Sequence, residues 1–100
     1  MTYRHVYAPK ALEEYKEAVS WYLKRSEKAA ENFIKEIDEK TATICKYPFR
    51  YRNTYKEFRE AALKKYPFSI VYLLDEQRKQ VIIFSIFHQK RSPRKKFLNK

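Results

Sequence analysis

The stretch that decides the fold is FREAALKKYPFSIVYLLDEQRKQVIIFSIFHQKRSPRKKF, residues Phe58–Phe97. Three of its runs are rich in β-branched and aromatic residues, and they predict strands over Phe58–Lys65, Ser69–Leu74 and Val81–Phe87. The polar residues Asp75–Lys79 predict a hairpin turn between the last two runs. The last third of the chain is therefore expected to form an antiparallel sheet.

The first half of the chain predicts two helices. Apolar residues recur at intervals of three and four from Lys10 to Arg25, and this pattern places Glu14 with the charged residues that face solvent. Ser26 is expected to cap the second helix through its hydroxyl group, and that helix ends before Pro48. Ion pairs along the second helix are expected from two glutamates that stand four residues before a lysine. These pairs are Glu31/Lys35 and Glu36/Lys40.

A short strand over Thr2–Tyr7 is expected before these helices, because the residues alternate loosely and end at Pro9. The predicted order is β-α-α-β-β-β in a single domain over residues 1–100. The fold class is α+β, with an antiparallel sheet and a helical hairpin packed on one of its faces. The chain has no glycine, so its turns are expected to use Asn53, Asp75 and Gln77.

The two longest strands are apolar on both faces, whereas a sheet covered on one side should alternate apolar and polar residues. Something is therefore expected to shield the second face of the sheet. The C-terminal residues Phe97 and Leu98 are one candidate. A partner chain is another, including a second copy of this chain in a homodimer of the free protein.

Positive charge is concentrated in the second half of the chain. The net charge is +11, and residues 46–100 hold 15 Lys and Arg against four Asp and Glu. Aromatic residues interleave with these cations, as on surfaces that bind nucleic acid. A polyanionic partner is therefore predicted, and a lysine-rich surface that only aids solubility is the alternative.

The sequence also bears on the cellular compartment. The N-terminal residues contain no apolar signal-peptide core, and the longest apolar run is too short to span a membrane. A single cysteine, Cys45, cannot form an internal disulfide bond. A cytoplasmic protein without membrane contact is expected, with Cys45 as a small core or boundary residue and not a nucleophile.

Several blocks, taken in order, resemble a known family. They are EAVSWYLKRS at residues 17–26, AAENFIKEI at 29–37, YPFSIVY at 66–72 and FHQKRSP at 87–93. This series resembles the RelE/ParE superfamily of bacterial type II toxin–antitoxin toxins, with the last two blocks closer to the ParE-like, plasmid-stabilisation branch. The resemblance implies a cognate antitoxin as partner, with an acidic or amphipathic segment that wraps the toxin.

The resemblance implies a toxin that arrests growth. RelE-like members cleave mRNA on the ribosome, and ParE-like members are described as inhibitors of DNA gyrase. Ribosome-associated mRNA cleavage is the first expectation, and the alternatives are gyrase inhibition or an inactive family member that still binds antitoxin. Gln89 stands where some ribosome-dependent relatives have a tyrosine, so the resemblance does not extend to the tyrosine of their proton-transfer arrangement.

A metal-independent endoribonuclease needs a proton carrier and cations that hold the phosphate. His88 fits the first role, because imidazole titrates near ~6.5. Arg59 and Arg91 fit the second, because a guanidinium group binds two phosphate oxygens at once; the resemblance also places an arginine of RelE-like nucleases at Arg59. Further cations are predicted to bind substrate. They are Lys56, Arg94, Lys95 and Lys96.

Each of these residues also has a structural interpretation. His88 could end a strand with its ring bonded to a backbone carbonyl, and Arg59 could pair with Glu57 or Glu60 at little energetic value. Trp21 is better explained by packing in the helical hairpin than by base stacking. The sequence shows no glycine-rich phosphate loop, no metal-ligand spacing and no Ser/His/Asp triad, so no metal or other cofactor is expected.

Overall fold

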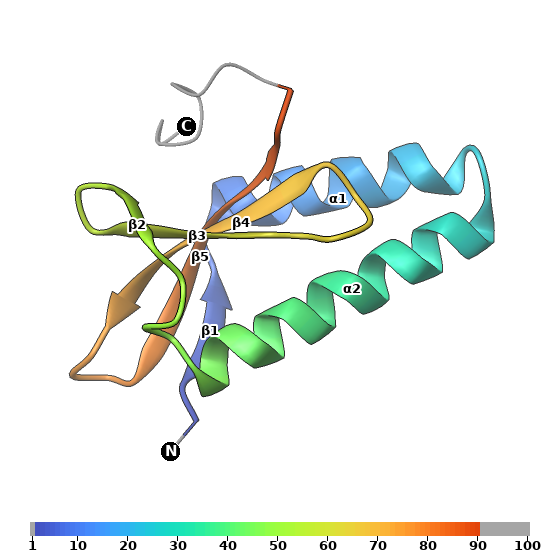
Figure 1. The fold of residues 1–100 in the computed structure, drawn as a ribbon. Coiled ribbons are helices and arrows are strands. Elements are labelled where there is room, and N and C mark those ends of the chain that lie inside the picture. The colour runs from blue at the N-terminus through green and yellow to red at the C-terminus, as the bar shows by residue number, and fades with distance from the viewer. Residues whose placement is uncertain (1, 91–100) are drawn as a thin grey trace.

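The structure is a computed structural model that describes residues 2–90. The predicted site residues Arg91, Arg94, Lys95 and Lys96 lie outside this range. Two helices and five strands follow one another along the chain (Figure 1). They are β1 (Arg4–Tyr7), α1 (Pro9–Leu23), α2 (Glu27–Lys46), β2 (Asn53–Tyr55), β3 (Phe58–Ala62), β4 (Phe68–Asp75) and β5 (Gln80–His88).

Both helices begin where the sequence predicts. Pro9 opens α1, a position where its missing N–H is not needed. The Ser26 hydroxyl accepts a hydrogen bond from the Ala29 amide at 3.2 Å and caps α2. The apolar stripe of α2 is buried against the rest of the core. Its buried residues are Ala30, Phe33, Ile37, Thr41, Ile44 and Cys45.

The sheet has the strand order β1-β5-β4-β3-β2, with the helical hairpin on one face (Figure 1). The predicted α+β class is confirmed, and the sheet differs from expectation in two details. β1 pairs with β5 in parallel, so the sheet is mixed and not wholly antiparallel. The strand β2 was not predicted, because it has only three residues and all of them are exposed, so burial leaves no pattern in the sequence.

Two of the three predicted turn residues, Asn53 and Asp75, take part in turns, although neither has the left-handed backbone conformation. The left-handed backbone conformation falls on Lys56, with φ 48°, and on Lys79, with φ 55°. Asn53 and Asp75 stabilise turns through their side chains instead. The Asn53 amide group donates to the Lys56 carbonyl at 3.2 Å, and an Asp75 carboxylate oxygen accepts from the Arg78 amide at 3.1 Å.

The predicted ion pairs along α2 are not formed. Glu36 points away from its helix and accepts hydrogen bonds from the backbone amides of Lys64 and Lys65, at 2.6 and 3.3 Å. Within residues 2–90, ion pairs join Lys10 to Glu14 and Asp75 to Arg78. Glu36, which the spacing predicted to pair with Lys40, instead holds the connection between β3 and β4.

The second face of the sheet is partly covered within this single chain. Val71 and Phe87 are buried, and the rings of Phe58 and Phe84 lie 4.8 Å apart. Phe97 and Leu98, which were expected to help cover this face, lie outside the described residues. The burial of Val71 and Phe87 weakens the sequence argument for a second copy over the sheet.

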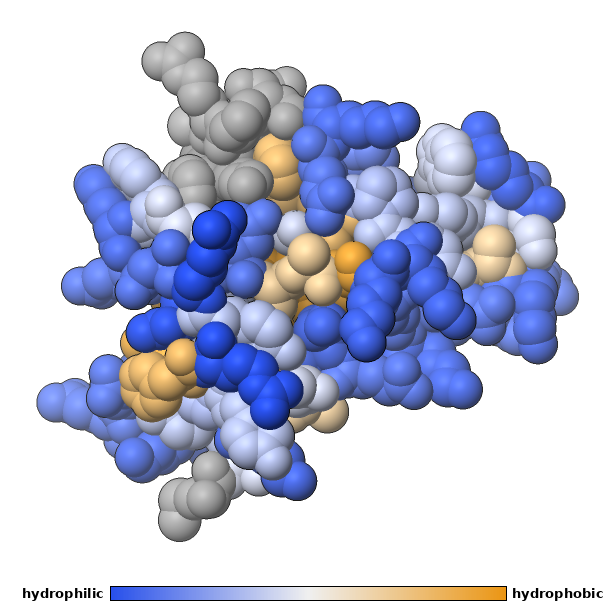
Figure 2. All heavy atoms as spheres, in the orientation of Figure 1, coloured by the Kyte–Doolittle hydropathy of each residue, from blue (hydrophilic) through white to orange (hydrophobic). Residues whose placement is uncertain are grey.

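Figure 2 shows the face in the orientation of Figure 1. Hydrophilic residues cover most of it, and apolar atoms show in the middle and at lower left, over the connection that leads from α2 into β2. Neither helix within residues 2–90 is long and apolar enough to cross a membrane.

Candidate functional site

His88 is the last residue of β5 and lies opposite Phe68 of β4. Its ring meets the Phe68 ring edge-on, with centroids 4.9 Å apart. The Nδ1 atom accepts a hydrogen bond from the Lys90 amide at 3.1 Å. Because Nδ1 is the acceptor, Nε2 is the nitrogen that carries the proton of the neutral ring. His88 therefore ends β5 with its ring hydrogen-bonded to the backbone, here to an amide.

A cavity of about 640 Å³ opens beside His88, between α1 and the end of the sheet. Its charged groups come from both sides, Glu14 and Glu17 from α1 and Lys90 from the residues after β5. Trp21 of α1 also lines this cavity. The site therefore places one imidazole among carboxylates and an ammonium group, and not among cations alone.

Trp21 does not pack into the hairpin as the sequence suggested. Its side chain is 50% exposed, and the Arg25 guanidinium group lies 3.5 Å from its ring centroid. The neighbouring Tyr22 makes the predicted packing contact, with its ring 5.1 Å from that of Phe33. The last turn of α1 and the residues that follow it thus present Trp21 and Arg25 together at the surface.

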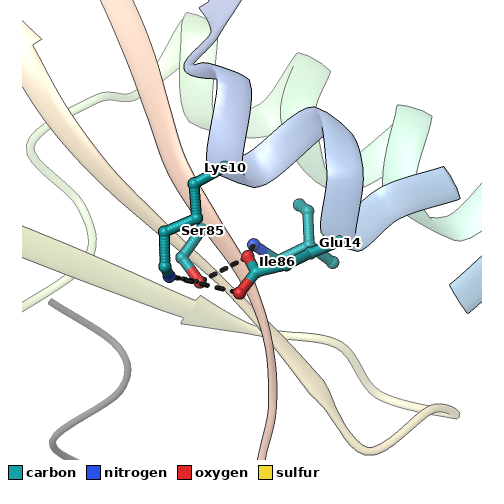
Figure 3. Close-up of polar contacts among 4 residues, drawn as sticks. All are labelled: Lys10, Glu14, Ser85 and Ile86. Carbon is teal, nitrogen blue, oxygen red and sulfur yellow. Dashed lines mark hydrogen bonds and ion pairs between the residues drawn. The ribbon is translucent and has the colours of Figure 1, made fainter. Parts of the chain in front are cut away.

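Glu14 connects α1 to β5 next to this cavity (Figure 3). Its Oε1 atom accepts hydrogen bonds from the Ser85 hydroxyl at 2.8 Å and from the Ile86 amide at 2.9 Å. Lys10 completes the network, with Nζ 3.2 Å from Glu14 Oε2 and 3.0 Å from Ser85 Oγ. The expectation that Glu14 faces solvent is therefore wrong, because its carboxylate is mostly buried between α1 and β5.

Arg59, near the start of β3, lies opposite Tyr72, in the middle of β4. Its Nη1 atom donates to the Tyr51 carbonyl at 2.6 Å, and its guanidinium group lies 5.3 Å from the Phe49 ring centroid. Tyr72, its partner on β4, donates its hydroxyl to the Pro48 carbonyl at 2.8 Å. Burial raises the pKa of Tyr72 to about 12, although the charge of Arg59 acts in the other direction. Arg59 thus holds the connection between α2 and β2.

The structure does not bring Arg59 and His88 together. Arg59 lies opposite Tyr72 and His88 lies opposite Phe68, four residues apart along β4. At the rise of an extended strand this separation is about 13 Å. Ile70, which lies between these two positions, is fully buried in the core.

The other predicted site residues do not join His88 either. Lys56 is in the turn between β2 and β3, at the far edge of the sheet from β5, and its Nζ lies 5.4 Å from the Tyr55 ring centroid. Cys45 is buried as predicted, and burial raises the pKa of its thiol, which disfavours the nucleophilic thiolate. Among residues 2–90, no three His, Cys, Asp or Glu side chains form a group that could hold a metal ion.

A family comparison identifies the chain. The family described as "ParE toxin of type II toxin-antitoxin system, parDE" matches residues 6–93. The chain belongs to the ParE toxin family. It is therefore the toxin component of a type II toxin–antitoxin system. No curated protein matches the sequence at a significant level.

Solved structures agree with the ParE toxin fold. A structure of the chromosomal ParDE system from P. aeruginosa is 16% identical, with a TM-score of 0.73, and covers 87% of this chain and 96% of its own. The intact E. coli RelBE toxin–antitoxin complex is 15% identical, with a TM-score of 0.63, and the match covers 89% of this chain and 99% of that one. A RelBE toxin–antitoxin complex from Mycobacterium tuberculosis is 11% identical, with a TM-score of 0.60, and the match covers 88% of this chain and 99% of that one. At these identities the likeness shows a shared fold.

Sequence reasoning missed Glu14 in this ParE toxin. Its only signal was Lys10, four residues earlier, because a pair at that spacing lies on one side of a helix. The spacing does not reveal that this side faces β5. That contact depends on where β1 ends, which is a property of the assembled sheet.

Proposed function

We propose that this ParE toxin arrests growth by binding an essential protein, and not by cutting RNA. The observation that carries the proposal is the separation of about 13 Å between the positions of Arg59 and His88 along β4. A cognate antitoxin neutralises the toxin, and both act in the cytoplasm. Two of the structurally similar proteins were solved as toxin–antitoxin complexes, which supports an antitoxin partner.

The separation matters because the groups that cleave RNA must act on the same phosphate. A general acid or base must lie within about 2.6–3.2 Å of the atom with which it exchanges a proton, and the cation must hold the same phosphate. The separation of His88 and Arg59 along β4 therefore supports a function that does not need the two side chains to act on one phosphate. Arg59 is also committed to the Tyr51 carbonyl, a bond of 2.6 Å that a substrate phosphate would have to replace.

DNA gyrase is the target that the family favours. The match to ParE toxins spans residues 6–93, and ParE-like members of the superfamily are described as gyrase inhibitors. Protein binding requires an exposed surface and no catalytic group. The cavity beside His88 and the exposed Trp21 provide such a surface on α1.

Ribosome-associated mRNA cleavage is the second candidate. It is favoured by the position of His88, which lines an open cavity together with Lys90 and directly precedes the cationic residues 90–96. In this mechanism His88 moves the proton, and Arg91 with Arg94, Lys95 and Lys96 holds the phosphate. Arg59 would then position the α2–β2 connection, and Lys56 would contact the RNA away from the cleaved phosphate.

Two assays with the purified full chain separate these candidates. The first measures DNA supercoiling by gyrase, and the second measures cell-free translation with mRNA ends mapped by primer extension. We expect inhibited supercoiling by the wild type, and intact mRNA with both the wild type and His88→Ala. Translation arrest with new mRNA ends that disappear in His88→Ala would overturn the proposal in favour of the nuclease. If the chain has no effect in either assay and does not arrest cells when expressed, it is an inactive family member.

A further inference from the structure

The connection between α2 and β2, taken here as residues 46–52 and so including Lys46 at the end of α2, pairs exposed aromatic rings with cations. The Arg50 guanidinium group lies 4.4 Å from the Tyr47 ring centroid, and Lys46 Nζ lies 5.5 Å from it. Phe49 has Arg59 at 5.3 Å. Tyr47 is 44% exposed and Phe49 is 51% exposed. Large aromatic side chains are therefore presented to solvent here, each beside a positive charge.

The charge of this region has a single sign. From residue 40 to residue 56 the sequence holds no Asp or Glu. Lysine and arginine side chains line the segment at short intervals. They are Lys40, Lys46, Arg50, Arg52 and Lys56. Because no carboxylate within the segment neutralises them, these cations favour an anionic partner.

Buried groups hold the connection in place. The Tyr72 hydroxyl donates to the Pro48 carbonyl at 2.8 Å, and Arg59 donates to the Tyr51 carbonyl at 2.6 Å. The Arg50 amide donates to the Tyr47 carbonyl at 3.1 Å. The backbone that carries the rings is thus fixed before any ligand arrives, so binding costs less ordering.

We propose that the α2–β2 connection binds single-stranded nucleic acid. Unpaired bases would stack on Tyr47 and Phe49, while Lys46, Arg50 and the other cations of the segment contact the phosphates. A duplex fits less well, because its bases are already stacked on one another. An acidic protein segment would pair with the cations, but its carboxylates would leave the two exposed rings without a matching surface.

This surface is separate from the cavity beside His88, which none of its residues lines. Its binding can therefore be measured independently of growth arrest. Figure 2 shows apolar atoms at the surface over this connection, surrounded by hydrophilic residues. That arrangement is the one expected of rings set among cations.

The test measures fluorescence anisotropy of labelled single strands of thymidine and of uridine nucleotides, and of a duplex, with the purified full chain. We expect both single strands to bind more tightly than the duplex. Phe49→Leu should weaken single-strand binding roughly five- to 100-fold, as expected for one lost stacking contact. Arg50→Gln should weaken it and lower the slope of log affinity against log salt by about 0.7.

The chain offers a matched control at the end of α1, where Arg25, just beyond the helix, lies 3.5 Å from the exposed Trp21 ring. Trp21→Leu and Arg25→Gln remove the same kinds of group and should leave binding unchanged. Thermal melts should show that each variant is folded. Arg50 is exposed, so its substitution tests the proposal even if Phe49→Leu fails to fold.

Three results would overturn the proposal. One is equal binding by the wild type, Phe49→Leu and Arg50→Gln. Another is an equal loss of binding in the α1 controls, which would reflect the overall charge of the chain. The third is displacement of the single strands by polyglutamate at equal charge concentration, which would assign the surface to an acidic protein segment. Preference for uridine or thymidine strands separates RNA from DNA.

Discussion

The Glu14 carboxylate accepts a hydrogen bond from the backbone N–H of Ile86 at 2.9 Å. A side chain of α1 thus binds the edge of β5 beyond the end of β1. The last pair between those strands joins Tyr7 to Ile83. Among residues 2–90, no strand neighbours the outer edge of β5 beyond Ile83, and Glu14 provides the acceptor there. A helix side chain thus completes the sheet beside His88.

Glu14→Ala should therefore destabilise the fold by about 1–3 kcal/mol, because the Ile86 amide and the Ser85 hydroxyl lose their acceptor in a buried place. Glu13→Ala, an exposed neighbour, should change the free energy of unfolding by less than about 0.5 kcal/mol. Urea unfolding of both variants measures the difference. Equal midpoints would show that the Glu14 bonds do not stabilise the fold.

Glu36→Gln should weaken the connection between β3 and β4. The carboxylate accepts hydrogen bonds from the Lys64 amide at 2.6 Å and from the Lys65 amide at 3.3 Å. A hydrogen bond to a charged acceptor contributes about 1.5–3 kcal/mol to stability, and one to a neutral acceptor contributes about 1 kcal/mol. We expect a loss of about 1 kcal/mol in urea unfolding. Glu31→Gln, on the exposed side of α2, is the control and should have no effect.

Stability should fall as the pH rises from about 10 to about 12. Burial raises the pKa of Tyr15 and of Tyr72 to about 12, from an ordinary value of 10.0. In that window the unfolded chain loses these protons and the folded chain keeps them, so deprotonation favours unfolding. The contribution of these tyrosines is fully present below pH 10 and is lost as the pH passes their folded pKa.

Tyr15→Phe should make this alkaline loss less steep, while the exposed Tyr55→Phe should not change it. Urea unfolding at a series of pH values, followed together with tyrosinate absorbance, measures both slopes. A wild-type stability that stays level up to pH 12 would contradict the assignment.

Lys79→Gly should stabilise the fold by about 0.5–1 kcal/mol, because a side chain with a Cβ atom strains the left-handed backbone and glycine does not. Lys79 has φ 55°, in the turn between β4 and β5. Glu76→Gly, in the same turn but outside the left-handed region, should destabilise by a similar amount through the entropy of the unfolded chain. Thermal melts of the two variants should shift in opposite directions.

The regular elements followed from the sequence because their signals are local. The hydroxyl of Ser26 and the apolar stripe from Ala30 to Ile44 define α2 without reference to any other part of the chain. The β4–β5 hairpin was predicted for the same reason, since long apolar runs flank a polar turn. Its strands extend one residue or less beyond the predicted ends.

The site did not follow, because its geometry depends on how strands are aligned. His88 and Arg59 were grouped by chemical type, and nothing local shows that they pair with residues four positions apart on β4. Glu14 and Glu36 look alike in sequence, as helix carboxylates near lysines. Both in fact accept backbone amides of distant segments.

The pairing of β1 with β5 has a consequence for the synthesis of this toxin. The first and last strands of the described chain are neighbours, so the sheet cannot be completed until residues 80–88 have left the ribosome. The apolar faces of the two helices have only a partial sheet to cover them before that point, because α1 packs chiefly on β5. The nascent chain therefore cannot reach its folded form before β5 has been synthesised.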